Sequence, residues 1–145
     1  MTDSARDRLA QHIDTIEKSY EFFLAYAAQG IRGGEGSKIS DQLRKSLDEM
    51  VEVVTGLSEL IRELQEDDPG TPEELDVYRE VVRQDAEKAG AALRLVRAQE
   101  SVSSQLIDNL NASVHLRALL TDLFLLDEIL KLNVASPSEE EAQVP

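Results

Sequence analysis

The sequence contains no cysteine, and this absence excludes several classes of chemistry. A chain without cysteine forms no disulfide, thiolate metal site, iron–sulfur cluster or cysteine nucleophile. Aromatic residues are also few, since the 145 residues include three tyrosines, three phenylalanines and no tryptophan. The absence of cysteine therefore excludes the catalytic and redox functions that depend on a thiol.

Long uncharged apolar runs are missing as well. A transmembrane helix needs roughly 18 or more apolar residues. The most apolar segment, residues 116–132, is interrupted by five charged residues: Arg117, Asp122, Asp127, Glu128 and Lys131. The first seven residues have neither the basic start nor the apolar core of a secretion signal. We therefore expect a soluble, cytoplasmic protein with no membrane partner.

Basic residues are scarce relative to acidic ones, with 15 against 29 and a formal net charge of −14. Such a charge repels nucleic-acid phosphates and anionic lipids, so we expect no nucleic-acid partner. Residues 38–68 are the most acidic segment, and a basic partner protein would favour their face. A salt-adapted proteome is another source of acidity, and the sequence leaves that alternative open.

What the chain has in abundance is helical periodicity, in a length that suits a single domain. In residues 4–30 apolar side chains recur at alternating steps of three and four, as in a helix packed lengthwise against others. These positions are Leu9, Ile13, Ile16, Tyr20, Phe23 and Ala27. Gly30 is placed to end this helix, and the glycines at 33, 34 and 36 predict a loop.

Residues 39–66 show the same periodicity most clearly, and we predict one helix for them. Its apolar positions are Leu47, Met50, Val54, Leu57, Ile61 and Leu64, with Ile39 and Leu43 upstream. The helix should stop before the Pro69–Gly70 pair. Thr71 and Glu74 then have the spacing of a capping box, with Pro72 at the first position of the next helix.

The boundary between the last two helices is ambiguous, because no proline occurs between residues 73 and 134. Two segments rich in serine or asparagine compete for it, residues 101–104 and residues 109–113. We favour the first, because it gives four helical segments of similar length.

The predicted fold is therefore all-α, an antiparallel four-helix bundle with coiled-coil-like packing. It occupies residues 1–134 as a single domain, and residues 135–145 form an acidic disordered tail. A turn at 109–113 would instead make the third helix long.

No arrangement of residues indicates catalysis or metal binding. Carboxylate-bridged metal sites in bundles use Glu-x-x-His pairs, and neither His12 nor His115 follows an acidic residue at that spacing. The glycine-rich stretch 33–38 lacks the spacing and the preceding strand of a phosphate-binding loop. We predict no catalytic residue, no metal site and no cofactor, and we expect that the protein is not an enzyme.

The last predicted helix carries more apolar residues than one packed face needs. Successive helical residues diverge by about 100° around the axis. We therefore predict that a second apolar face forms an association surface, among Leu116, Leu120, Phe124 and Leu125. The alternative is that this helix lies centrally and buries both faces within one chain.

The aromatic cluster at residues 20–26 supplies two further interface candidates, Phe22 and Tyr26. Four aromatic side chains within seven helical residues cannot all point one way. At least one of them should therefore lie away from the core.

These features predict a non-enzymatic protein–protein interaction module that acts through helix–helix contacts, as an adaptor, assembly chaperone, accessory subunit or regulator. The expected partner is another protein or a second copy, with a homodimer favoured. Two alternatives stay open: an acidic mimic that occupies a basic nucleic-acid-binding surface, and a helical bundle that holds a metal or ligand with carboxylates. A mimic should release its target steeply as salt rises, whereas an apolar helix–helix complex should not.

Overall fold

The structure is a computed structural model that describes residues 4–33 and 38–143, with side chains described as far as residue 132. Across these residues the chain forms six α-helices and no strand, which confirms the predicted all-α class. None of the helices in this part of the chain combines the length and the apolar character that crossing a membrane requires. The predicted tail at 135–145 lies where side chains are not described, so its disorder stays a prediction.

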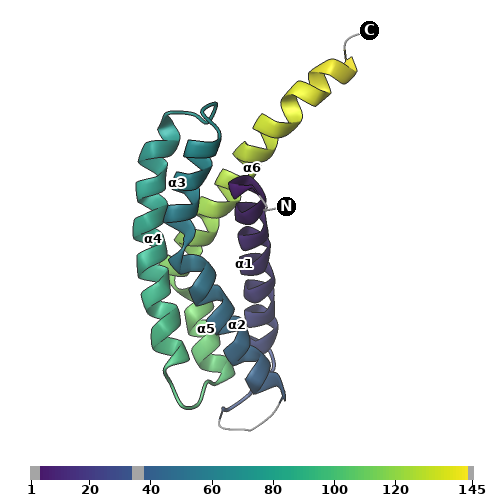
Figure 1. Ribbon diagram of the computed structural model, residues 1–145. Helices are drawn as coiled ribbons and strands as arrows, with labels where there is room; N and C mark the ends of the chain where they lie inside the picture. The colour runs from purple at the N-terminus through teal and green to yellow at the C-terminus, as the bar shows by residue number, and fades with distance from the viewer. Residues whose placement is uncertain (1–3, 34–37, 144–145) are drawn as a thin grey trace.

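The helices lie side by side along one long axis (Figure 1). The chain runs down α1, up through α2 and α3, down α4, and up again through α5 and α6. Helix α4 makes the most extensive contacts, with α6 on one side and with α2 on another. The bounds are α1 Ala5–Ala27, α2 Lys38–Thr55, α3 Leu57–Asp67, α4 Glu74–Arg97, α5 Ser104–Ala112 and α6 Val114–Gln143.

The apolar positions predicted from periodicity form the core. A buried aliphatic side chain contributes roughly 1.5–3 kcal/mol through the hydrophobic effect, so these residues supply most of the stabilisation. Tyr20 and Ala27 pack at the edge of this cluster. The other predicted positions of the first two segments are buried: Leu9, Ile13, Ile16, Phe23, Leu43, Leu47, Met50, Val54, Leu57, Ile61 and Leu64, whereas Ile39 is partly buried.

The segment predicted as one helix from 39 to 66 is two helices, which meet at Gly56. Gly56 has φ −94° and ψ 0°, outside helical geometry. Glycine lacks a side chain to restrict it and weakens a helix interior by roughly 0.5–1 kcal/mol relative to alanine. The apolar face nevertheless continues across the break, because Val54 and Leu57 on either side are both buried.

The start of α4 also differs from the prediction. Helix α4 begins at Glu74, and neither Thr71 nor the preceding Glu73 caps it with a side-chain hydrogen bond. Asp68 holds this turn instead: its Oδ1 accepts from the Gly70 N–H at 3.0 Å, and its Oδ2 accepts from Arg6 of α1 at 2.9 Å. The capping-box prediction at Thr71 is therefore wrong, because the N-cap position falls at Glu73.

Both segments that competed for the last boundary interrupt the helix. The chain reverses before α5, as favoured, and Ser103 caps α5 by accepting from the Leu106 N–H at 3.1 Å. Ser104 ties this turn to the end of α1, because its hydroxyl donates to the Tyr26 carbonyl at 2.6 Å and accepts from the Ile31 N–H at 2.9 Å. At Ser113 a second break with φ −58° and ψ 127° separates α5 from α6 without a reversal.

Replacing Leu57 with aspartate should unfold the protein, because Leu57 is fully buried where α2 meets α3. An unpaired buried charge costs about 3–5 kcal/mol against a total stability of about 5–15 kcal/mol. The matched control is Leu95→Asp, because Leu95 is 67% exposed. Urea unfolding followed by circular dichroism should show a large loss for Leu57→Asp and little change for Leu95→Asp. Equal unfolding curves for the two variants would show that Leu57 is not part of the core.

Candidate interaction surface

Besides Val114 at its first position, helix α6 exposes four large apolar side chains over residues 124–132, outside its buried leucine face. They are Phe124, Leu125, Ile129 and Leu132, with exposed fractions of 43%, 51%, 38% and 60%. We call these four residues the α6 outer strip. On the opposite face of the same helix six leucines are buried: Leu116, Leu119, Leu120, Leu123, Leu126 and Leu130. Helix α6 is therefore apolar around most of its circumference over these turns.

The structure divides the four candidates that the sequence placed on a second face of this helix. Leu116 and Leu120 lie in the core, with 0% and 4% exposure, so they cannot line an accessible surface. Around the helix axis, Leu116 lies about 20° from the buried Leu123, because it precedes Leu123 by seven positions. Leu120 precedes Leu123 by three positions and lies about 60° from it. Phe124 and Leu125 lie about 100° and 160° away and point outward.

The two aromatic candidates on α1 belong to the packed interior. Tyr26 is fully buried, and its hydroxyl donates to the Val102 carbonyl at 2.6 Å. Phe22 is partly buried and packs beside Tyr26, with ring centroids 6.3 Å apart. The hydrogen bond from Tyr26 ties the end of α1 to the turn before α5.

An apolar groove runs beside the α6 outer strip, where the first turns of α4 meet α6. We call it the α4–α6 groove. Its volume is about 210 Å³. An enclosed apolar cavity of roughly 150 Å³ accommodates benzene, so the groove has room for one or two aliphatic side chains. Its lining comprises Pro72, Glu74, Leu75, Tyr78, Leu125, Leu126, Ile129 and Leu130.

A pair of carboxyl groups lies next to this groove, between α4 and α6. Asp122 of α6 is 9% exposed, and the Tyr78 hydroxyl lies 3.2 Å from its carbonyl oxygen and 3.4 Å from its Oδ1. Burial, and then hydrogen bonding to the Asp85 carboxyl of α4, raise the pKa of Asp122 to about 7. Its Oδ2 accepts from no donor among the described residues, which also favours a protonated carboxyl that can itself donate. Burial and the neighbouring Asp122 raise the pKa of Tyr78 to about 12, so Tyr78 stays protonated.

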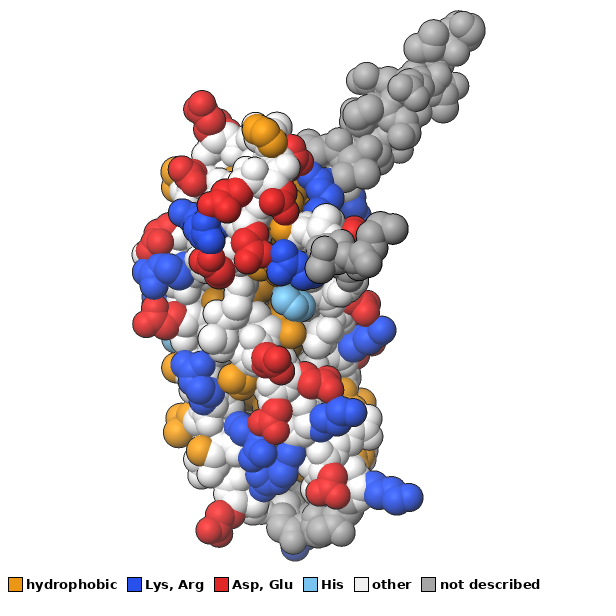
Figure 2. Space-filling view, viewed as in Figure 1, with side chains coloured by type: hydrophobic (Ala, Val, Ile, Leu, Met, Phe, Trp, Pro, Cys, Tyr) orange, Lys and Arg blue, Asp and Glu red, His pale blue; other side chains and the backbone are white. Residues whose placement is uncertain are grey.

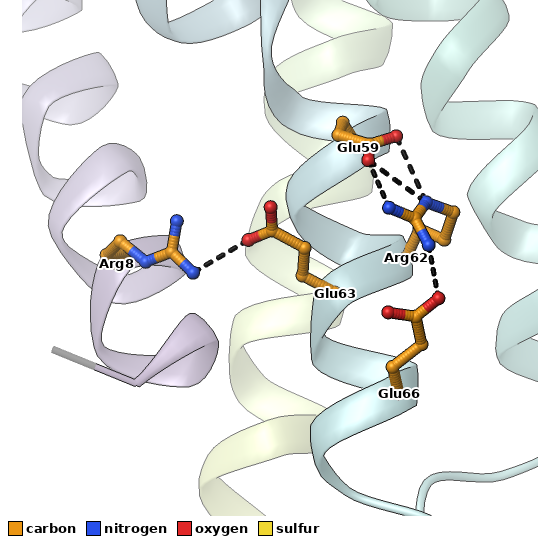
Figure 3. Close-up of polar contacts among 5 residues, drawn as sticks. All are labelled: Arg8, Glu59, Arg62, Glu63 and Glu66. Carbon is orange, nitrogen blue, oxygen red and sulfur yellow. Dashed lines mark hydrogen bonds and ion pairs between the residues drawn. The ribbon is translucent and has the colours of Figure 1, made fainter. Parts of the chain in front are cut away.

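The acidic segment 38–68, expected to attract a basic partner, is largely engaged in ion pairs. Six of its nine acidic residues pair with basic side chains. Glu63 of α3 accepts from Arg8 of α1 at 2.7 Å, while Arg62 lies between Glu59 and Glu66 (Figure 3). The space-filling view shows acidic and basic side chains interleaved on this side of the molecule (Figure 2). Exposed pairs of this kind stabilise little, but they neutralise much of the charge on this face.

The two histidines, His12 and His115, lie in different surroundings. Among the residues that the structure describes, no group of three or more His, Asp or Glu side chains could hold a metal ion. His12 is half-buried, and burial followed by the nearby Arg8 charge lowers its pKa. His115 is exposed. Most of the glycine-rich stretch, residues 34–37, lies outside the described residues.

No family model, no curated protein and no solved structure matches this chain.

Replacing Asp122 with asparagine should raise the stability of the protein at alkaline pH but not at acidic pH. The native pKa of about 7 exceeds the ordinary value of 3.8, so the folded state holds a proton that the unfolded chain releases between these two values. The free energy of unfolding therefore falls as pH rises from about 4 to about 7 and then levels off. Asp122→Asn removes this loss and should gain about 1–3 kcal/mol over the parent protein near pH 8.

Urea titrations of both proteins near pH 4 and near pH 8 measure this difference. The exposed Asp108 provides the control, since Asp108→Asn should leave the pH dependence of the parent unchanged. A gain from Asp122→Asn of the same size at both pH values would show that the pKa of Asp122 is not raised in the folded protein.

Proposed function

We propose that the protein is a non-enzymatic interaction module that binds another protein through the α6 outer strip. The observation that carries this proposal is the exposure of Phe124, Leu125, Ile129 and Leu132 along one face of one helix. Monomeric proteins expose single apolar side chains routinely, but a contiguous apolar patch usually marks a binding site.

The dimensions of the strip suit contact with a partner helix. Phe124 and Leu132 are eight residues apart, which corresponds to roughly 12 Å along the axis and more than two turns. Leu125, Ile129 and Leu132 are spaced at four and three positions, the pattern by which one helix packs lengthwise on another. Complete burial of each side chain would add roughly 1 kcal/mol or more to an association.

The architecture that we propose for this module is an antiparallel four-helix bundle with coiled-coil-like packing. In this description α2 with α3, and α5 with α6, each count as one interrupted helix. Such a bundle presents α6 as a rigid surface, in the manner of adaptors, accessory subunits and assembly chaperones. The ion pairs on α3 support this module over an acidic mimic, because they leave less uncompensated charge for a basic target.

Phe124→Glu should abolish binding of the native partner while leaving the protein folded. Phe124 is 43% exposed, so a charge at this position remains solvated and should change the free energy of unfolding by less than about 1 kcal/mol. Leu95→Glu is the matched control, because Leu95 is also exposed but lies at the far end of α4 from the groove. Light scattering after size-exclusion chromatography, with and without native lysate, measures the mass of any complex.

The parent protein and Leu95→Glu should both form the complex, and Phe124→Glu should elute as a folded protein of 16.1 kDa. Retention of the complex by all three proteins would exclude the α6 outer strip as the contact. Unfolding of Phe124→Glu would place this side chain in the core and would exclude it equally.

A further inference from the structure

The α4–α6 groove is shaped for the apolar ridge of a helix. Leu75 and Tyr78 form its α4 wall, while Leu125 and Ile129 form its α6 wall. A helix places side chains at i and i+4 on one face, and such a pair of aliphatic side chains matches the room in the groove. The α6 outer strip then continues the contact beyond the groove, because Leu125 and Ile129 belong to both surfaces.

Two exposed carboxylates lie on this surface, Glu74 and Glu128. Glu74 lines the groove and Glu128 adjoins Ile129, and both side chains are exposed. No ion pair within 4.0 Å joins either of them to a basic side chain of the described residues. Carboxylates at the edge of an apolar contact favour a partner that brings lysine or arginine.

Two basic residues of α4 and α6 near the groove form ion pairs that do not involve Glu74. Arg83 pairs with Glu80 and Glu87 along its own helix. Lys131 pairs with Asp127, on the side of α6 that meets α1. Neither cation pairs with Glu74, whereas the pKa of the Lys131 ammonium is raised by Asp127 and, to a smaller extent, by the Glu128 carboxylate, which lies close enough to contribute.

A second copy of this chain would fit the α4–α6 groove poorly, because its charge has the same sign. Its own α6 face would bring an equally acidic edge, and the whole chain carries a net charge of −14. Like charges placed opposite each other oppose association and suppress the wrong partner. Nucleic acid and anionic membranes are repelled by the same charge.

Building on the interaction module proposed above, we infer that the α4–α6 groove binds an amphipathic helix of a different protein, with an apolar ridge flanked by lysine or arginine. The ridge occupies the groove between Leu75 and Ile129. The basic flanks meet Glu74 and Glu128. This partner chemistry deepens the proposed function, because it names what the α6 outer strip recognises.

Three synthetic peptides of about 20 residues test this inference against the full-length protein. The first has leucines at helical spacing and lysines elsewhere, the second replaces the lysines with glutamates, and the third scrambles the leucine–lysine sequence. Fluorescence anisotropy should show saturable binding of the first peptide only, with at least about tenfold weaker binding of the other two. Equal binding of the scrambled peptide would indicate charge attraction alone, and equal binding of the glutamate peptide would exclude a basic partner; either result overturns the inference.

Two variants locate the contact. Leu125→Glu should weaken binding of the leucine–lysine peptide at least about tenfold, and Glu74→Gln should weaken it by several-fold. Leu95→Glu and Glu100→Gln are the matched controls, because both residues are exposed, Leu95 in the last turn of α4 and Glu100 three residues after its end. Unchanged binding by both Leu125→Glu and Glu74→Gln would overturn the inference, and if Leu125→Glu unfolds, Glu74→Gln alone decides it.

The same measurements separate this inference from the proposed function. If Phe124→Glu loses the native partner while the three peptides bind equally, the proposed interaction module is supported and the inference of a basic partner helix is rejected. If Phe124→Glu keeps the native partner and the peptide still binds at Leu125, the groove has this chemistry but the α6 outer strip is not the contact.

Discussion

Helix α6 carries apolar side chains around most of its circumference, and a helix can press only part of its surface against its neighbours. Helix α4 covers most of the inner face, with smaller contributions from α1 and α5. Six leucines are buried by this packing, and the four side chains of the α6 outer strip remain exposed. The exposed strip is a consequence of this excess, because the same burial that fixes α6 in the protein leaves its outer face available.

Polar contacts set the position of α6 against its neighbours and therefore the position of the strip. Arg6 donates to the carbonyl of Leu130 at 2.9 Å and to Asp68 at 2.9 Å, so one side chain links α1, α6 and the turn before α4. On the other side of α6, Tyr78 of α4 contacts Asp122 beside the groove. Part-buried hydrogen bonds of this kind are directional, whereas apolar contacts are not, so they select one register among several that would bury leucine equally well.

Local patterns predicted the all-α class and the inward faces of α1, α2 and α3, because an apolar residue at every third or fourth position can be read directly from the sequence. The break at Gly56 was not predicted, because its only indication in the sequence is one glycine within a strong apolar pattern. The start of α4 was not predictable, since Asp68 meets Arg6 62 residues away. For the candidate surface, the angular distance from Leu123 would have separated the buried Leu120 from the exposed strip. The Tyr78–Asp122 contact had no local signal at all, because it exists only once α4 and α6 pack.

The absence of cysteine permits a direct measurement of the central claim, that α6 buries one apolar face and exposes the other. Single cysteines at 116, 120, 124 and 125, with 95 as an exposed reference, can be alkylated in the folded protein and their rates compared. Exposed thiols react freely, whereas buried thiols react only when the structure opens. The account predicts rates at 124 and 125 within about threefold of the rate at 95, and rates at 116 and 120 more than about tenfold slower. Equal rates at all four α6 positions, or faster reaction at 116 and 120, would contradict it.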